Sequence, residues 1–175
     1  MTDQPVVSKS QPLANLRPSG EELLSKLAGL PAEALEAGCY ENGWNGRQVL
    51  AHIAAIEWTY PRLIDLARDG PPDKKPKAAA TSKPATGGIN SYNDRQIARY
   101  ADHTTAELLD VFRKNRETTI STIEATEDEL FATEVRSAGG VKGPLGTVLN
   151  FVAVMHVNVH VSDVLDSAAR AQASS

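Results

Sequence analysis

The sequence predicts an all-α protein with four long helices and one shorter helix. Three observations support this prediction. Apolar residues recur at helical spacing over most of the chain, capping motifs stand at three expected helix starts, and no stretch shows the alternation of a β-strand. The chain has 175 residues and no internal repeat, which suits one domain.

The first helix is expected over residues 20–36, after a loose lead-in at residues 1–18. Ser19 and Glu22 have the spacing of a capping box, and Pro31 can end the helix early. The expected inner face consists of leucines: Leu23, Leu24, Leu27 and Leu30.

The second helix starts at Asn45, which forms a capping-box pattern with Gln48. Its apolar face recurs at helical spacing through Val49, His52, Ile53, Ile56, Tyr60 and Leu63. Pro61 is expected to bend this helix, and Gly70-Pro71-Pro72 to end it.

Residues 69–88 form a polar connection rich in proline and lysine, long enough for a crossover between distant helices. Two interpretations of it stay open, a cover over a pocket and a plain solvated linker. A short helix is expected over residues 90–101 and a long one over 105–125, with Thr104 and Glu107 as its capping box.

Residues 127–144 look irregular, and the last helix is expected to start near Thr147 and to reach about residue 169. The predicted organisation is therefore one helical domain over residues 19–170, with a frayed tail at 171–175.

Charge and composition exclude several classes of protein. With 18 basic and 22 acidic residues, the net charge of −4 argues against nucleic-acid binding. The single cysteine, Cys39, excludes an internal disulfide and fits a reducing cytoplasm. The N-terminus does not resemble a targeting segment, and polar residues interrupt the most apolar stretch, residues 148–161, so no membrane association is expected.

The main chemical signal is a pair of histidines, His156 and His160, in the last helix. Residues four apart lie on one side of a helix, so the two imidazoles suit one metal ion. Asp163 falls on the same stripe, as a further ligand or as an acceptor that orients His160.

His52 lies on the apolar face of the second helix and can converge with His156 and His160 inside a bundle. The alternative is that each histidine bonds a backbone carbonyl or a carboxylate; the placement of three of the four histidines favours a metal site. His103 is interpreted as a surface or capping residue and Cys39 as incidental.

Three neutral imidazoles leave a metal with open coordination positions, which suits catalysis better than structure. Gln48, one turn before His52, and Asp163 are the nearest candidates for polar catalytic roles around such a metal. Glu57 is discounted as a partner of His52, because five residues place it well round the helix.

The segment Gly43-Trp44-Asn45-Gly46-Arg47-Gln48-Val49-Leu50-Ala51-His52, followed by the late His156-x-x-x-His160 pair, resembles the DinB/YfiT-like superfamily of metalloenzymes. This superfamily includes the N-terminal domain of mycothiol-dependent maleylpyruvate isomerase. The resemblance extends over residues 19–169, where the expected helices follow one another in the same order as in this superfamily.

The resemblance implies a four-helix bundle with a long crossover that binds zinc or nickel through His52, His156 and His160. It also implies a low-molecular-weight thiol cosubstrate, such as mycothiol or bacillithiol, or else a hydrolase activity. Related bundles are often dimers, so a homodimer is expected.

The sequence departs from the family pattern at several points, and these departures bear on which branch of the superfamily it resembles. Many DinB-type proteins carry glutamine where this chain has Asp163, which favours the isomerase-like branch, yet isomerases can carry glutamate at the position of His156. The sequence ends soon after the expected last helix, so the isomerase's second domain is not expected in it and the isomerase activity is not inferred.

The function expected from the sequence is a metal-dependent, thiol-using transferase or a hydrolase acting on a small electrophilic molecule. Two alternatives without turnover stay open: a bundle that binds a small ligand, and a dimeric interaction protein.

Overall fold

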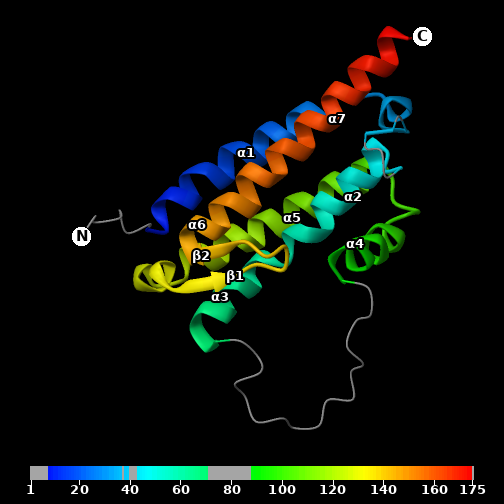
Figure 1. Cartoon of the computed structure of the whole chain (residues 1–175). Helices are drawn as coiled ribbons and strands as arrows, with labels where there is room; N and C mark the ends of the chain where they lie inside the picture. The colour runs from blue at the N-terminus through cyan, green and yellow to red at the C-terminus, as the bar shows by residue number, and fades with distance from the viewer. Residues whose placement is uncertain (1–7, 37, 40–42, 71–87, 175) are drawn as a thin grey trace.

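The computed structural model describes residues 8–36, 38–39, 43–70 and 88–174 and confirms the predicted four-helix bundle (Figure 1). The bundle consists of four helical columns, each a long helix or two helices end to end. The first three are α1 (Ser10–Ala28), α2 (Gly46–Glu57) with α3 (Tyr60–Asp69), and α5 (Thr105–Glu124). The fourth is continuous through α6 (Leu145–Asn150), the π-helical turn η4 (Phe151–Met155) and α7 (His156–Ala173).

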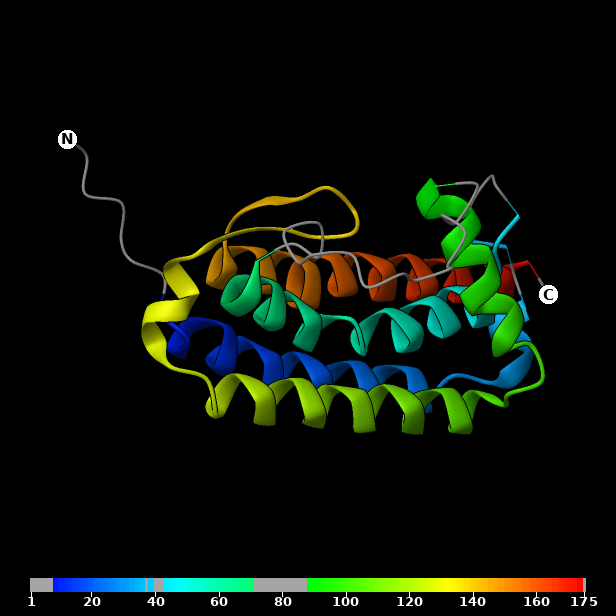
Figure 2. The ribbon, with the colours of Figure 1, turned by 90° about the horizontal axis from the view of Figure 1, so that it is seen from below.

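The order of the helices around the bundle differs from a simple up-and-down arrangement. α1 packs against α5 and the last helix, and α2 also packs against α5 and α7. Figure 2 shows that α1 and the last helix run in one direction, whereas α2–α3 and α5 run in the other. Each long helix therefore has one parallel and one antiparallel neighbour.

The predicted crossover and shorter extra helix are also confirmed. Helix α3 ends near one end of the bundle, and α4 (Gly88–Arg99) packs on α2 near the other end (Figure 1). The interpretations of the connection itself concern residues 71–87, which lie outside the described part of the chain.

The first helix begins about ten residues earlier than expected, so residues 10–18 are not a loose lead-in. Burial explains the difference, because the helix continues through the exposed Pro18 and places Leu16, Gly20, Leu23 and Leu27 on one buried stripe. The expected capping box at Ser19 is wrong, since its hydroxyl donates to the Leu16 carbonyl inside the helix. The helix ends at Ala28, and a separate 3-10 turn, η1 (Ala32–Glu36), follows Pro31.

The other two capping boxes are confirmed, at Asn45 with Gln48 and at Thr104 with Glu107. The expected bend at Pro61 is instead a break between α2 and α3. Pro61 lies in the first turn of α3, where its missing N–H has no helical partner to lose.

Residues 127–144 are more regular than expected. A 3-10 turn, η3 (Asp128–Ala132), leads into an antiparallel hairpin of β1 (Glu134–Arg136) and β2 (Lys142–Pro144). Strands of three residues are too short to show an alternating pattern in the sequence.

Within the described chain, the last helix alone combines great length with an apolar sequence. Leu145–Ala173 is long and apolar enough to cross a membrane, with a mean hydropathy of 1.4 in its most apolar 18-residue window. In the bundle, however, its apolar stripe packs against α1, α2 and α3. We therefore assign it as a core helix of the bundle.

Candidate metal centre

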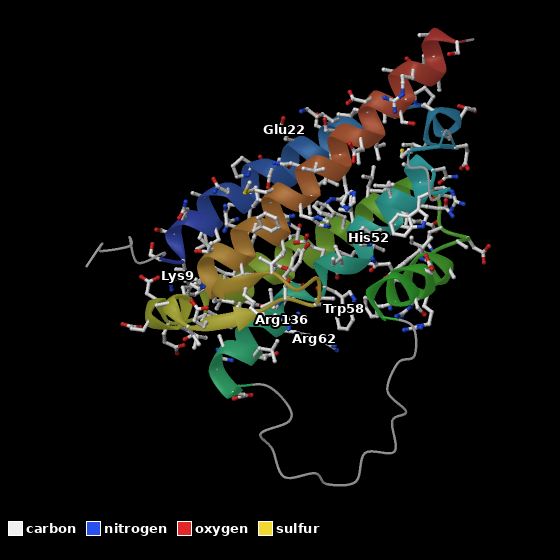
Figure 3. All side chains as sticks on the ribbon, viewed as in Figure 1. Lys9, Glu22, His52, Trp58, Arg62 and Arg136 are labelled. Atoms are coloured by element: carbon white, nitrogen blue, oxygen red, sulfur yellow. The ribbon has the colours of Figure 1, made fainter. Side chains whose placement is uncertain are left out.

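Three histidines meet between α2 and α7. His52, on the buried face of α2, is only 5% exposed, and α7 contributes His156 and His160, both half-buried. One ring nitrogen from each of the three lies within 4.8 Å of the other two. Figure 3 labels His52 where α2 lies beside the last helix. We call these three residues the histidine cluster.

The two histidines of α7 are neighbours on one turn of helix. Their Nε2 atoms are 3.1 Å apart, and their ring centroids are 4.4 Å apart. The ring of His52 lies 5.1 Å from that of His160 and 6.1 Å from that of His156. The sequence predicted this convergence, and the structure brings all three residues together.

A π-helical turn directly before His156 explains how the last helix keeps one face inward. The apolar stripe of this helix recurs at every fourth residue. In a regular α-helix, four residues rotate by about 40° more than one full turn, so the stripe would drift round the helix by about 160° over four such steps. The turn takes up part of this drift, because the His156 N–H bonds to the Phe151 carbonyl five residues back. The residues of this stripe are all buried: Leu145, Leu149, Ala153, Val157 and Val161.

Burial keeps the histidine cluster unprotonated at neutral pH. It lowers the pKa of His52 to about 3, aided by the nearby charges of His160 and His156. It lowers the pKa of His160 to about 4, with His156 acting in the same direction and Asp163 opposing it. The pKa of His156 is also lowered by burial. Neutral imidazoles offer free lone pairs, and this donor set fits a divalent ion such as zinc or nickel.

The histidine cluster opens onto a cavity of about 590 Å³. This volume falls within the usual range for small-molecule sites, roughly 300–1,000 Å³. Arg62, labelled in Figure 3, is the one formally charged side chain among the described lining residues and lies 3.9 Å from the Trp58 ring centroid. The walls are largely apolar, with contributions from Ile56, Leu63, Leu66, Val141, Phe151 and Val152.

Gln48 and Asp163, the two predicted catalytic residues, lie beside this cavity without lining it. The Gln48 side-chain oxygen accepts a hydrogen bond of 2.9 Å from the Asn45 N–H, and Gln48 lines a separate cavity of about 250 Å³. Asp163 is half-buried, and its charge acts on His160. Their catalytic roles stay predictions.

The other candidates lie apart from the histidine cluster. The His103 ring contacts Tyr100, with 5.0 Å between the ring centroids. The Cys39 N–H donates to the Trp44 carbonyl before α2 begins. Neither belongs to the candidate metal-binding group found among the described residues.

A buried ion pair next to the site was missed in the sequence. Glu57 is fully buried on α2, and its carboxylate Oε1 lies 2.6 Å from Arg116 Nε on α5. Burial raises the pKa of Glu57 to about 7, although Arg116 opposes the shift. The sequence does contain a sign that Arg116 is buried, because this residue falls on the apolar helical stripe between Phe112 and Ile120.

These pKa values predict how metal binding depends on pH. Because His52 and His160 carry pKa values of about 3 and 4, protons compete for their nitrogens only in acid. Between pH 8 and about pH 5, we expect zinc affinity to fall only below the ordinary imidazole pKa of 6.5, because burial lowers the pKa of His156 as well. A chelator-competition titration across this range tests the prediction. A steep loss that begins near pH 6.5 would show ordinary, solvated imidazoles.

The fold and the histidine cluster together define a four-helix bundle with a candidate metal site in the lining of a cavity. The sequence matches the family described as the mycothiol maleylpyruvate isomerase N-terminal domain over residues 16–165. The chain belongs to this family. Among curated proteins, none matches the sequence significantly.

Solved structures of two proteins share the fold. The mycothiol-dependent maleylpyruvate isomerase superposes with a TM-score of 0.68 at 17% identity, over 93% of this chain and 61% of that one. YfiT from Bacillus subtilis, described as a probable metal-dependent hydrolase with an unusual four-helix bundle topology, superposes with a TM-score of 0.71 at 13% identity. That match covers 98% of this chain and 94% of YfiT. The chain thus spans about three-fifths of the isomerase's length and nearly all of YfiT's.

Proposed function

We propose that the protein is a divalent-metal-dependent enzyme that directs a thiol or water nucleophile to a small electrophilic molecule. The observation that supports this proposal is the convergence of three neutral imidazoles within 4.8 Å beside an open cavity. His52, His156 and His160 would hold the ion, and zinc or nickel suits such a set of nitrogen ligands.

The residues of this chain would divide the work between binding and orientation. When held by three neutral ligands, such an ion would lower the pKa of a bound water or thiol to near 7. The apolar cavity walls would hold the substrate's body and exclude bulk water. Asp163 would orient His160, and Gln48 would act indirectly, by holding the start of α2 one turn before His52.

The relatives support both kinds of nucleophile. One structural neighbour is described as mycothiol-dependent and the other as a probable metal-dependent hydrolase. Membership of the mycothiol maleylpyruvate isomerase N-terminal domain family favours a thiol cosubstrate, such as mycothiol or bacillithiol. Such a cosubstrate would supply the reacting thiol, which leaves Cys39 outside the reaction. The isomerase's own reaction is not carried over, because this chain spans only 61% of that protein.

An activity screen of metal-reconstituted protein tests the proposal. Protein stripped with a chelator and reloaded with zinc or nickel is mixed with a chromogenic aryl halide plus a thiol, or with an activated ester alone. We expect turnover with at least one of these substrates. The stripped protein and the His156→Ala variant should show no turnover. His103→Ala is the matched control, because His103 lies outside the histidine cluster, and it should keep full activity.

The apolar cavity also supports a second candidate, a bundle that binds a small ligand without turnover. That function would be favoured if a hydrophobic fluorescent probe bound with equal affinity to the metal-loaded and the stripped protein and no turnover were found. We further propose a cytoplasmic homodimer, for which light scattering after size exclusion tests the oligomeric state.

A further inference from the structure

One buried guanidinium links all four helical columns of the bundle. Arg116 on α5 is 4% exposed, and its Nη1 donates to the Leu16 carbonyl and to the Ser19 hydroxyl of α1, at 3.1 and 3.3 Å. Its Nη2 donates to Glu57 Oε2 on α2 at 3.0 Å and to the Ala153 carbonyl in η4 at 2.7 Å. The Glu57–Arg116 pair therefore connects α1, α2 and α5 to the π-helical turn.

The π-helical turn leaves one backbone carbonyl without its usual helical partner. Because the His156 N–H bonds to Phe151, the Val152 carbonyl lacks the partner that it would have in a regular α-helix. The Tyr60 hydroxyl donates to this carbonyl instead, at 2.7 Å, while Arg116 donates to its neighbour Ala153. Two buried side-chain donors thus stabilise the turn at consecutive carbonyls.

The turn decides which way the following histidines point. One extra residue in a helix rotates everything beyond it by about 100°. His156 follows the turn immediately and His160 comes one turn later, so their direction relative to His52 depends on the turn's conformation.

We infer that the Glu57–Arg116 pair positions the histidine cluster, by holding η4 in its π-helical form so that His156 and His160 face His52. Neither residue lines the cavity, so both act through the turn and not on a substrate. The inference rests on the proposed metal site, while its structural half concerns the metal-free protein.

A double variant, Glu57→Leu with Arg116→Met, separates this role from simple stabilisation. Both charges are removed together and the volumes stay similar, so the bundle is expected to fold. We expect zinc binding, measured by chelator competition, to weaken by about tenfold or more. In the metal-free protein, we expect the backbone amides of residues 153–157 to exchange hydrogen faster, because the turn has lost a donor.

Three further variants complete the test. Arg113→Met removes an exposed arginine of α5 that pairs with Asp110, and it should change neither readout. Leu27→Ala lowers stability from a buried position on α1, and it should leave zinc affinity unchanged. Tyr60→Phe removes the donor to Val152 alone, and it should speed exchange and weaken zinc binding by a smaller factor.

Several outcomes would overturn the inference. Wild-type zinc affinity together with unchanged exchange in the double variant would do so, as would an equal loss of zinc binding in Leu27→Ala. If the double variant does not fold, the single variant Arg116→Met, measured at pH 6 against the wild-type protein, decides by the same criteria, because it removes the donor to Ala153. If the wild-type protein binds no metal, the proposed function fails, and exchange at residues 153–157 still decides whether the pair holds the turn.

Discussion

Replacing His52 by alanine is expected to weaken zinc binding by more than about 100-fold, because changes outside the ligands themselves already cost about 10–100-fold. His52 is the one member of the histidine cluster that comes from α2, so its loss leaves only the adjacent pair on α7. Two imidazoles from one helix retain weak affinity but lose the ligand that joins two helices. Calorimetric titration of the metal-free protein with zinc measures the change.

The bundle itself should survive this substitution. His52 is buried with its pKa held at about 3, so folding already keeps it neutral at pH 7, and no buried charge is left without a partner. His103→Ala is the matched control and should bind zinc like the wild-type protein. Unchanged zinc affinity in His52→Ala would contradict a metal site at the histidine cluster.

Replacing Arg116 alone by methionine is expected to destabilise the protein by about 3–5 kcal/mol at alkaline pH, because the Glu57 carboxylate then lies buried without a counter-charge. The loss should depend on pH. Arg116 lowers the pKa of Glu57, so without it this pKa rises further above its value of about 7. Urea unfolding at pH 5, 7 and 9 measures the free energy of unfolding.

The sign of this pH dependence follows from the raised pKa of Glu57. A carboxyl whose pKa is higher in the folded protein than the unfolded value of 4.5 stabilises the fold fully below that value. This stabilisation is lost as the pH rises through the folded pKa, so the variant should lose least at pH 5 and most at pH 9. Arg113→Met, at an exposed position, should change stability by less than about 0.5 kcal/mol. An equal loss at all three pH values would mean that Glu57 is not the group responsible.

Local sequence signals predicted well where a single turn of chain decides the structure. The capping boxes at Asn45 and Thr104 formed, since each needs only side chains three residues apart. They failed at Ser19, because burial of Leu16 extends α1 backwards through a position that looks like a helix start. The hairpin after η3 was missed, since its strands are held by pairing with each other and not by a pattern within either strand.

The helical class, the mild acidity and the three histidines on apolar stripes could all be predicted from the amino-acid sequence, because periodicity and residue type are properties of the chain. Two features could be known only from the packed bundle: Gln48 does not line the cavity of the histidine cluster, and Glu57 meets Arg116. The same holds for the π-helical turn that precedes His156. These features depend on contacts between helices that are distant in sequence, so no local pattern predicts them. A buried carboxylate needs a counter-charge from another helix, and a π-helical turn needs donors from neighbouring helices to occupy its carbonyls.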